Sequence, residues 1–195
     1  MTETLAPSLP SLDQVEALVT SRRTSLLCDP DRPVPDELVD RLVELIRWAP
    51  NHKRTWPWRV AVVTGEGRAR LGEAFAADLE ASGRPADDPK VVKNRTKYLR
   101  APLVLVVGAA PHDNELLDAE NRYAVAAGIE NLLLGARAAG LASFWASPPV
   151  CPRPRALAVC GFPADTELVG VVYLGWPIGE PPVPERPPIE TNRVT

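Results

Sequence analysis

The sequence lacks the features that mark membrane, secreted and nucleic-acid-binding proteins. Its longest apolar stretches, such as residues 103–109, are about seven residues, whereas a helix that spans a bilayer needs about 20. Residues 1–10 contain neither a basic region nor an apolar core, so we expect no signal peptide. The 22 basic and 25 acidic residues give a net charge of -3 without a long run of one sign. We therefore expect a cytoplasmic protein with no nucleic-acid or membrane partner.

Cysteine, histidine and nucleotide-binding motifs are equally scarce. Cys28, Cys151 and Cys160 form no C-x-x-C pair and leave one thiol over in any disulfide scheme, so we expect reduced, buried cysteines. His52 and His112 lie far apart without a metal-ligand spacing, so no metal site is expected. No G-x-G-x-x-G follows the first expected strand, and neither a Walker A motif nor a G-x-S-x-G elbow occurs. Rossmann, P-loop and α/β-hydrolase sites are therefore unsupported.

Proline, in contrast, is abundant, with 22 among 195 residues, about twice the usual share of ~5%. Because proline is excluded from helix interiors and central strands, the proline-free windows should hold the regular elements. Six prolines crowd into residues 177–188, which cannot form a helix. The length suits one domain. We predict a single domain over residues 1–195, with 177–195 as a proline-rich extended C-terminal arm.

Hydrophobic spacing predicts helices and strands in alternation. The expected helices cover residues 12–21, about 35–49, about 71–79, part of a polar surface segment at 83–100, 118–140 and 153–160. The expected strands cover residues 59–64, 103–109, 141–146 and 168–175. This alternation indicates one layered domain with helices on the faces of a sheet. Taken alone, the pattern favours a doubly wound parallel sheet.

Four segments, in order, resemble the nitroreductase family of flavin mononucleotide (FMN) enzymes. They are SRRTS at 21–25, RWAPNHKRTWPWRVAVV at 47–63, AGIENLLLGARAAGLASFW at 127–145 and LVGVVYLGWP at 168–177. The PNHK form at 50–53 is similar to a small subgroup whose loop reads Pro-Asp-His-Lys. Together the segments span nearly the whole chain.

The resemblance implies an α+β fold, which replaces the parallel-sheet expectation. This fold is a three-layer sandwich with a mainly antiparallel central sheet flanked by helices, assembled as an intertwined homodimer with two flavin sites at the interface. The implied activity is hydride transfer from NADH or NADPH through bound FMN to a flat electron-poor acceptor, such as a nitroaromatic or quinone. Two other interpretations stay open. One is a flavin-binding or cofactor-handling protein of this fold with weak or no turnover, and the other is a dimeric interaction module without a cofactor.

The same resemblance assigns cofactor-binding roles to individual residues. Arg22, Arg23 and Thr24 fall where the family binds the flavin phosphate, and His52 falls at a flavin contact. Arg54, or Lys53 beside it, would supply a cation near the flavin ring. The implied walls of the pocket and the segment that packs against the flavin are Trp56, Trp145, Ala146 and Ser147. No side chain is assigned a covalent catalytic role, because the flavin carries the chemistry.

Several positions depart from the family pattern. Leu26 and Leu27 occupy a place where the family usually has a basic residue, and Ala146 stands where the subgroup often has Arg. Trp56 replaces an amide side chain before Pro-Trp, and Glu180 replaces a cation beyond the final Leu-Gly-x-Pro, so that the nearest cation there is Arg186. The sequence leaves open whether these changes abolish turnover, which nicotinamide and acceptor are used, and whether another flavin or a deazaflavin replaces FMN.

Overall fold

The structure of the protein is a computed structural model that describes residues 9–195. The expectation that the chain has no signal peptide rests mainly on residues 1–8, which lie outside the described part. The α-helices of the described part are α1 (Leu12–Ser21), α2 (Asp36–Glu44), α3 (Gly67–Ala81), α4 (Pro89–Thr96), α5 (Glu115–Ala138) and α6 (Pro154–Val159). The short 3-10 helices are η1 (Leu45–Trp48), η2 (His52–Arg54) and η3 (Lys97–Arg100). The strands are β1 (Trp58–Thr64), β2 (Leu103–Ala109), β3 (Ala142–Ala146) and β4 (Glu167–Gly175).

The strands form one sheet in the order β1-β2-β4-β3, and every neighbouring pair is antiparallel. The α+β sandwich implied by the resemblance is therefore confirmed, and the parallel sheet favoured by the pattern alone is wrong. Alternating helices and strands resemble βαβ units, but hydrophobic periodicity does not encode the direction in which a strand re-enters the sheet. Here β2 and β3 run in the same direction, but β4 lies between them and runs opposite to both, so no neighbouring strands are parallel.

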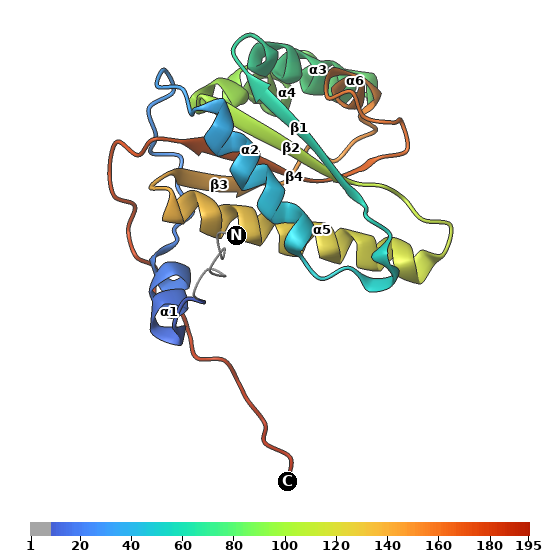
Figure 1. Cartoon of the computed structure of the whole chain (residues 1–195). Coiled ribbons are helices and arrows are strands. Elements are labelled where there is room, and N and C mark those ends of the chain that lie inside the picture. Colours follow the sequence, from blue (N-terminus) through green and yellow to red (C-terminus); the bar gives the residue numbers. More distant parts are fainter. Residues whose placement is uncertain (1–8) are drawn as a thin grey trace, which may run out of the picture.

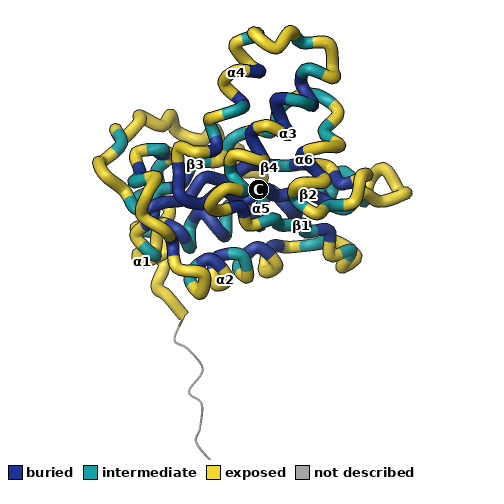
Figure 2. Tube along the Cα trace, turned by 90° about the horizontal axis from the view of Figure 1, so that it is seen from above, coloured by how far each residue is buried: buried dark blue, intermediate teal, exposed yellow. Residues whose placement is uncertain are grey.

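Helices cover both faces of the sheet and make three layers (Figure 1). Alternate residues of β2 point to opposite faces, so Leu103 and Leu105 pack with α2 and α5, whereas Val104 and Val106 pack with α3 and α6. Figure 2 shows the buried residues gathered in the sheet and in the helix sides that face it. Burial of apolar side chains on both faces explains why residues 103–109 form a continuous apolar run.

Helix α5 lies close against η1 because Gly128 has no side chain. A Cβ at Gly128 would come within 2.8 Å of the carbonyl oxygen of Ile46. This close approach, together with the buried residues Ile129 and Leu132, holds α5 along the sheet. The long helix is therefore a fixed support for anything attached to its two ends.

Two segments differ from the compact body. Helix α1 begins at a capping box, in which Ser11 and Gln14 exchange hydrogen bonds, but it has no buried residue. The segment 83–100, expected on the surface, buries Val91, Asn94 and Tyr98 under α3 and the sheet. The surface prediction was wrong there because lysines and arginines between these residues hide their helical spacing.

The C-terminal segment follows β4 without forming a further helix or strand. Pro177 forms a bridge with Cys28, and the Ile178 amide donates to the Leu27 carbonyl at 3.0 Å. Residues 184–195 are exposed and run away from the sheet (Figure 1). The prediction of an extended arm on a partner stays a prediction.

The three cysteines are free thiols. Cys28 is buried, whereas Cys151 and Cys160 are half-buried, so full burial was correct for one of the three. Burial raises the pKa of Cys28, and it raises the pKa of Cys160 to about 12. A raised pKa lowers the fraction of thiolate at neutral pH, and the thiolate is the reactive form of cysteine.

Within residues 9–195, no helix is both long enough and apolar enough to cross a membrane.

Candidate functional site

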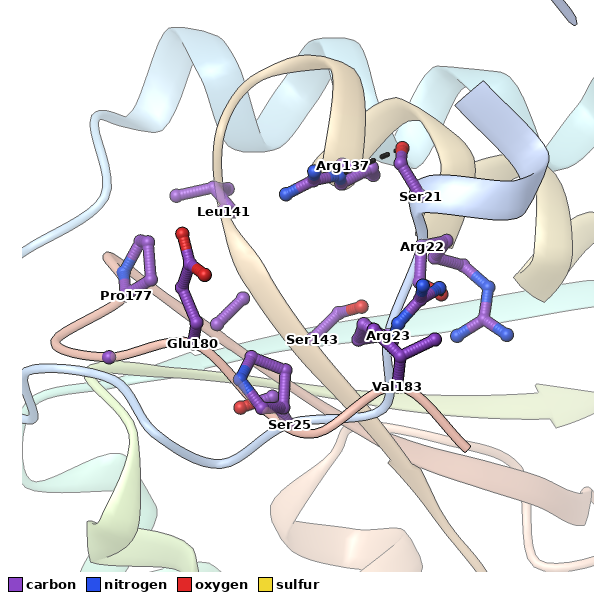
Figure 3. A pocket seen from close by; sticks show the side chains of 13 residues that line it. Ser21, Arg22, Arg23, Ser25, Arg137, Leu141, Ser143, Pro177, Glu180 and Val183 are labelled. Atoms are coloured by element: carbon purple, nitrogen blue, oxygen red, sulfur yellow. Dashed lines mark hydrogen bonds between the residues drawn. The ribbon is translucent and has the colours of Figure 1, made fainter. Parts of the chain in front are cut away.

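A cavity of about 340 Å³ opens where the end of α1, the C-terminal end of α5, the start of β3 and the C-terminal segment meet (Figure 3). The residues that line it come from three distant parts of the chain, at 21–25, 137–143 and 177–183. They are Ser21, Arg22, Arg23, Ser25, Arg137, Leu141, Ala142, Ser143, Pro177, Gly179, Glu180, Pro181 and Val183. Three arginines and a single glutamate are the charged members of this set, so the cavity favours an anion.

Two of these arginines belong to the predicted phosphate motif. The Arg22 Nε lies 3.2 Å from Glu130 Oε1 of α5, and its side chain is only 17% exposed. Arg23 donates through Nη1 to the carbonyl oxygens of Thr20 at 2.6 Å and Arg22 at 2.8 Å. Part of Arg23 therefore caps the C-terminus of α1, where carbonyls lack helical partners. The other N–H groups of both forks are available to a ligand.

The segment after these arginines lies along the edge of the sheet. Thr24 forms a parallel bridge with Ser143, and the Ser25 amide donates to the Ser143 carbonyl at 2.8 Å. These backbone contacts fix the SRRTS segment beside β3. The structure thus brings Arg22, Arg23 and Thr24 to the strand that carries the predicted flavin-packing residues.

Trp145 lies on the same strand, two residues after Ser143 and on the same face of the sheet. Its indole rests against Gly170 of β4, where an added Cβ would lie 2.3 Å from the indole nitrogen. Trp145 remains 37% exposed, so part of the residue is accessible. Ala146 ends β3 and Ser147 begins the exposed loop after it.

The loop between Pro50 and Pro57 is held in an unusual conformation. Lys53, Arg54 and Trp56 have φ values of 58°, 53° and 51°, which is the left-handed region that non-glycine residues seldom adopt. Such strain persists only where surrounding contacts impose it, and it is concentrated at functional sites.

A hydrogen-bond network imposes this loop conformation. Asn51 Oδ1 accepts from the Trp56 amide at 2.9 Å, and Asn51 Nδ2 donates to Thr55 Oγ1 at 3.0 Å. Thr55 in turn donates to Asn121, which is buried in α5 and donates to the Ala110 carbonyl at 3.2 Å. The loop is therefore tied to the N-terminal part of α5.

His52 is fixed by an acidic residue of the same helix. Its Nδ1 lies 2.7 Å from Oε2 of Glu120. The ring remains half-exposed, so its other nitrogen faces outward from this contact. The Arg54 side chain has no hydrogen-bond or ion-pair partner among the described residues.

The predicted site residues therefore form two groups in one chain. Arg22 contacts α5 at Glu130, and His52 contacts it at Glu120, which are about 15 Å apart along the helix at 1.5 Å per residue. Arg137, in the cavity, is about 25 Å from Glu120 on the same basis. We call Arg22, Arg23 and Thr24, together with strand β3, the first half-site. We call His52, Arg54 and Trp56 the second half-site.

Sequence reasoning missed the residues that hold each half-site in place. Arg137, Glu130, Glu120, Asn121 and Ser143 all contact segments that are far away in the chain. The sequence carries one partial signal, because Asn51 and Thr55 are turn-forming polar residues inside the proline-bounded loop. The contacts of Arg137 and Glu120 have no local signal.

The Nitroreductase family model matches residues 19–176, and the protein belongs to this family. Among known proteins, the chain is similar to "Putative NAD(P)H nitroreductase YdjA" of Escherichia coli (strain K12). The two are 30% identical over 167 residues, which cover 85% of this chain and 89% of the relative. The family membership supports an oxidoreductase.

Solved structures share the fold. The crystal structure of a nitroreductase-like family protein from Bacillus cereus has a TM-score of 0.77 and 25% identity, covering 93% of this chain and 95% of that chain. The FMN-dependent nitroreductase NfnB from Mycobacterium smegmatis, in complex with NADPH, has a TM-score of 0.68 and 24% identity, covering 86% and 90%. The latter likeness shows the fold alone.

The cavity residues fit the phosphate end of a flavin mononucleotide. A phosphate monoester carries about -1.5 to -2 charge near neutral pH and accepts hydrogen bonds from guanidinium forks. The cavity offers three such forks and the hydroxyls of Ser21, Ser25 and Ser143. Residues 9–195 hold no cluster of three or more His, Cys, Asp or Glu that suits a metal ion.

The contact between Trp145 and Gly170 gives a direct test of the β3 half-site. Gly170→Ala should force the indole to move, because the new methyl group would overlap it. Overpacking of this kind typically costs about 1–3 kcal/mol. We expect the free energy of unfolding, measured by urea titration, to fall by that amount.

The matched control removes the indole. In a Trp145→Ala background, the added methyl at Gly170 meets only Ile129 at 3.2 Å, so its cost should largely disappear. An equal cost in both backgrounds would show that the indole does not occupy this position.

Proposed function

We propose that the protein is a flavin-dependent oxidoreductase that uses NADH or NADPH to reduce a flat, electron-poor acceptor such as a nitroaromatic or quinone. The observation that carries this proposal is the arginine-lined cavity at the start of β3, the strand that also carries the part-exposed Trp145, in a chain of the nitroreductase family. NfnB, which shares the fold, is described as FMN-dependent and binds NADPH. These facts support FMN as the cofactor of this chain too.

The residues of the first half-site would bind and orient the cofactor. Bound FMN supplies the redox chemistry, accepting a hydride from the nicotinamide and passing electrons to the acceptor. Arg22, Arg23 and Thr24 would hold the phosphate, and the exposed part of Trp145 would form a wall beside the ring system. Ala146 ends this strand and Ser147 follows it, so both would lie beside this wall.

The second half-site would contact the ring and the acceptor. Arg54 and Lys53 carry positive charge on a rigid loop, and a fixed cation stabilises the negative charge that builds up near the flavin pyrimidine. Glu120 holds His52 by Nδ1, which leaves the opposite ring edge for a hydrogen bond. Trp56 is 59% exposed and would narrow the entrance to flat molecules.

Because the two half-sites lie at different positions along α5, we propose that a homodimer completes each flavin site. The phosphate half-site of one copy would face the loop 50–57 of its partner, related by a two-fold axis. The exposed apolar residues support a second copy of this chain as the covering partner. They are Leu12, Val15 and Val19 of α1, Tyr123 of α5, and Trp48 and Trp56 near the loop. Within the C-terminal arm 177–195, residues 177–183 line the cavity of their own chain, and the exposed residues 184–195 would then lie across the partner.

A flavin-binding protein of the same fold with weak turnover is the second candidate. Glu180 inside the cavity and Ala146 in place of a cation are the observations that favour it. The naming of the similar Escherichia coli protein as an NAD(P)H nitroreductase favours the enzyme. Three arginines against one glutamate still leave the cavity positive.

The visible spectrum of the purified protein is expected to show bound flavin. Adding NADH or NADPH without oxygen should bleach the flavin absorbance, because the proposed enzyme passes a hydride to the cofactor. A nitroaromatic or quinone should then restore the colour. Colourless protein that takes up no added FMN would contradict the proposed function, whereas bound flavin that neither nicotinamide bleaches would favour the second candidate.

The proposed dimer is tested by substitutions in α1, none of whose residues is buried in the single chain. Val15→Asp together with Val19→Asp places two charges on the exposed apolar face. The change should leave the fold of one chain intact but convert the dimer to monomer in light scattering, because charges at a buried interface remain unpaired. We expect flavin to be lost as well.

Ala17→Asp is the matched control for this prediction. Ala17 lies on the opposite side of α1 by helical spacing, so the added charge should stay in water and leave the dimer unchanged. A wild-type protein that is a flavin-loaded monomer, or a Val15 and Val19 variant that stays dimeric, would refute the assembly.

A further inference from the structure

We propose that Arg137 is a third phosphate-binding arginine of this chain and that it gives the cavity its preference for a phosphorylated flavin. This inference rests on the proposed function and adds a residue to it. Arg137 lines the same cavity as Arg22 and Arg23, although it comes from the end of α5, more than a hundred residues later. Arg137 is not part of the SRRTS motif at 21–25.

The position of Arg137 is fixed by one contact that leaves its donors free. The guanidinium Nε donates to Ser21 Oγ at 3.0 Å. Its two terminal nitrogens have no hydrogen-bond or ion-pair partner among the described residues. Figure 3 shows Arg137 between Leu141 and Ser21, with its guanidinium end toward the cavity. Anchoring at Nε orients the fork, so binding an anion costs less side-chain entropy.

The other two arginines are partly engaged. Glu130 neutralises Arg22 through a 3.2 Å ion pair. One terminal nitrogen of Arg23 donates to the backbone carbonyls of Thr20 and Arg22. Glu180 adds a negative charge to the cavity lining. Without Arg137, the positive charges of Arg22 and Arg23 would be balanced by the negative charges of Glu130 and Glu180. A phosphate monoester, in contrast, needs a positive site. Arg137 therefore supplies the excess positive charge and the free bidentate fork.

A purely structural role for Arg137 makes a different prediction. A cation in the last turn of α5 interacts favourably with the helix dipole, so its removal would lower stability slightly whatever ligand is present. Riboflavin carries the same ring system as FMN but has no phosphate. The ratio of the two dissociation constants therefore isolates the phosphate contribution from any general loosening of the fold.

The experiment titrates full-length protein, freed of flavin by dialysis, with FMN and with riboflavin. Arg137→Ala should weaken FMN binding about ten- to a hundredfold, as expected for the loss of a charge-assisted contact, and leave riboflavin binding unchanged. Arg137→Lys keeps the charge and should retain part of the preference. Glu180→Gln should shift the ratio the other way, towards FMN. Arg41→Ala, an exposed arginine of α2 outside the cavity, is the matched control and should change nothing.

Other outcomes would contradict either the role of Arg137 or the proposed function. If the wild-type protein prefers FMN and Arg137→Ala keeps the full preference, the role of Arg137 is wrong and the proposed function stands. If Arg137→Ala weakens both flavins equally, Arg137 is structural only. If the wild-type protein binds neither flavin, the proposed function falls and this inference falls with it.

Discussion

The position of α5 against the sheet is the constraint on which the rest of the structure depends. The helix is held by buried side chains and by the close approach to η1 that Gly128 permits. Its C-terminal half carries Glu130 and Arg137, which fix the end of α1, and its N-terminal half carries Glu120 and Asn121, which fix the strained loop. Because a packed helix cannot shorten, these two groups of residues keep their separation. This fixed separation within one chain is the reason for proposing that a second copy completes the site.

The charge of the cavity depends on residues at which this chain departs from the family pattern. Sequence comparison within the family pattern finds several expected cations replaced, among them by Glu180, which would weaken an anion site if nothing else changed. The structure places Arg137 in the same cavity with its terminal nitrogens free. A charge supplied from a distant element can therefore stand in for one that the local motif has lost. Under the proposed function, Arg137 would in this way offset the charge of Glu180 at the phosphate end of the cavity.

Local patterns in the sequence predicted the elements well and their arrangement poorly. Hydrophobic spacing predicted a helix at 12–21, and the apolar run predicted a strand at 103–109, because both signals come from residues close together in the chain. The antiparallel order of the strands came only from the family resemblance, since periodicity has no direction. The backbone contacts that place Thr24 and Ser25 beside Ser143, on the strand of Trp145, have no signal in the sequence. The separation of His52 from that strand, and the role of Glu120, depend on where α5 lies and could not be read from spacing.

The central claim is that each flavin site is built from two copies of the chain, and mixing two defective variants tests it most directly. One variant carries Arg22→Ala and Arg23→Ala, and the other carries His52→Ala, Arg54→Ala and Trp56→Ala, so that each homodimer lacks one kind of half-site. Co-expression with two different tags allows the mixed dimer to be purified and its flavin measured against protein. The account predicts that both homodimers are depleted of flavin and that the mixed dimer regains a single site, formed by the intact half-sites of the two chains. A mixed dimer as empty as its parents would show that the two half-sites must act within one chain, which contradicts the account.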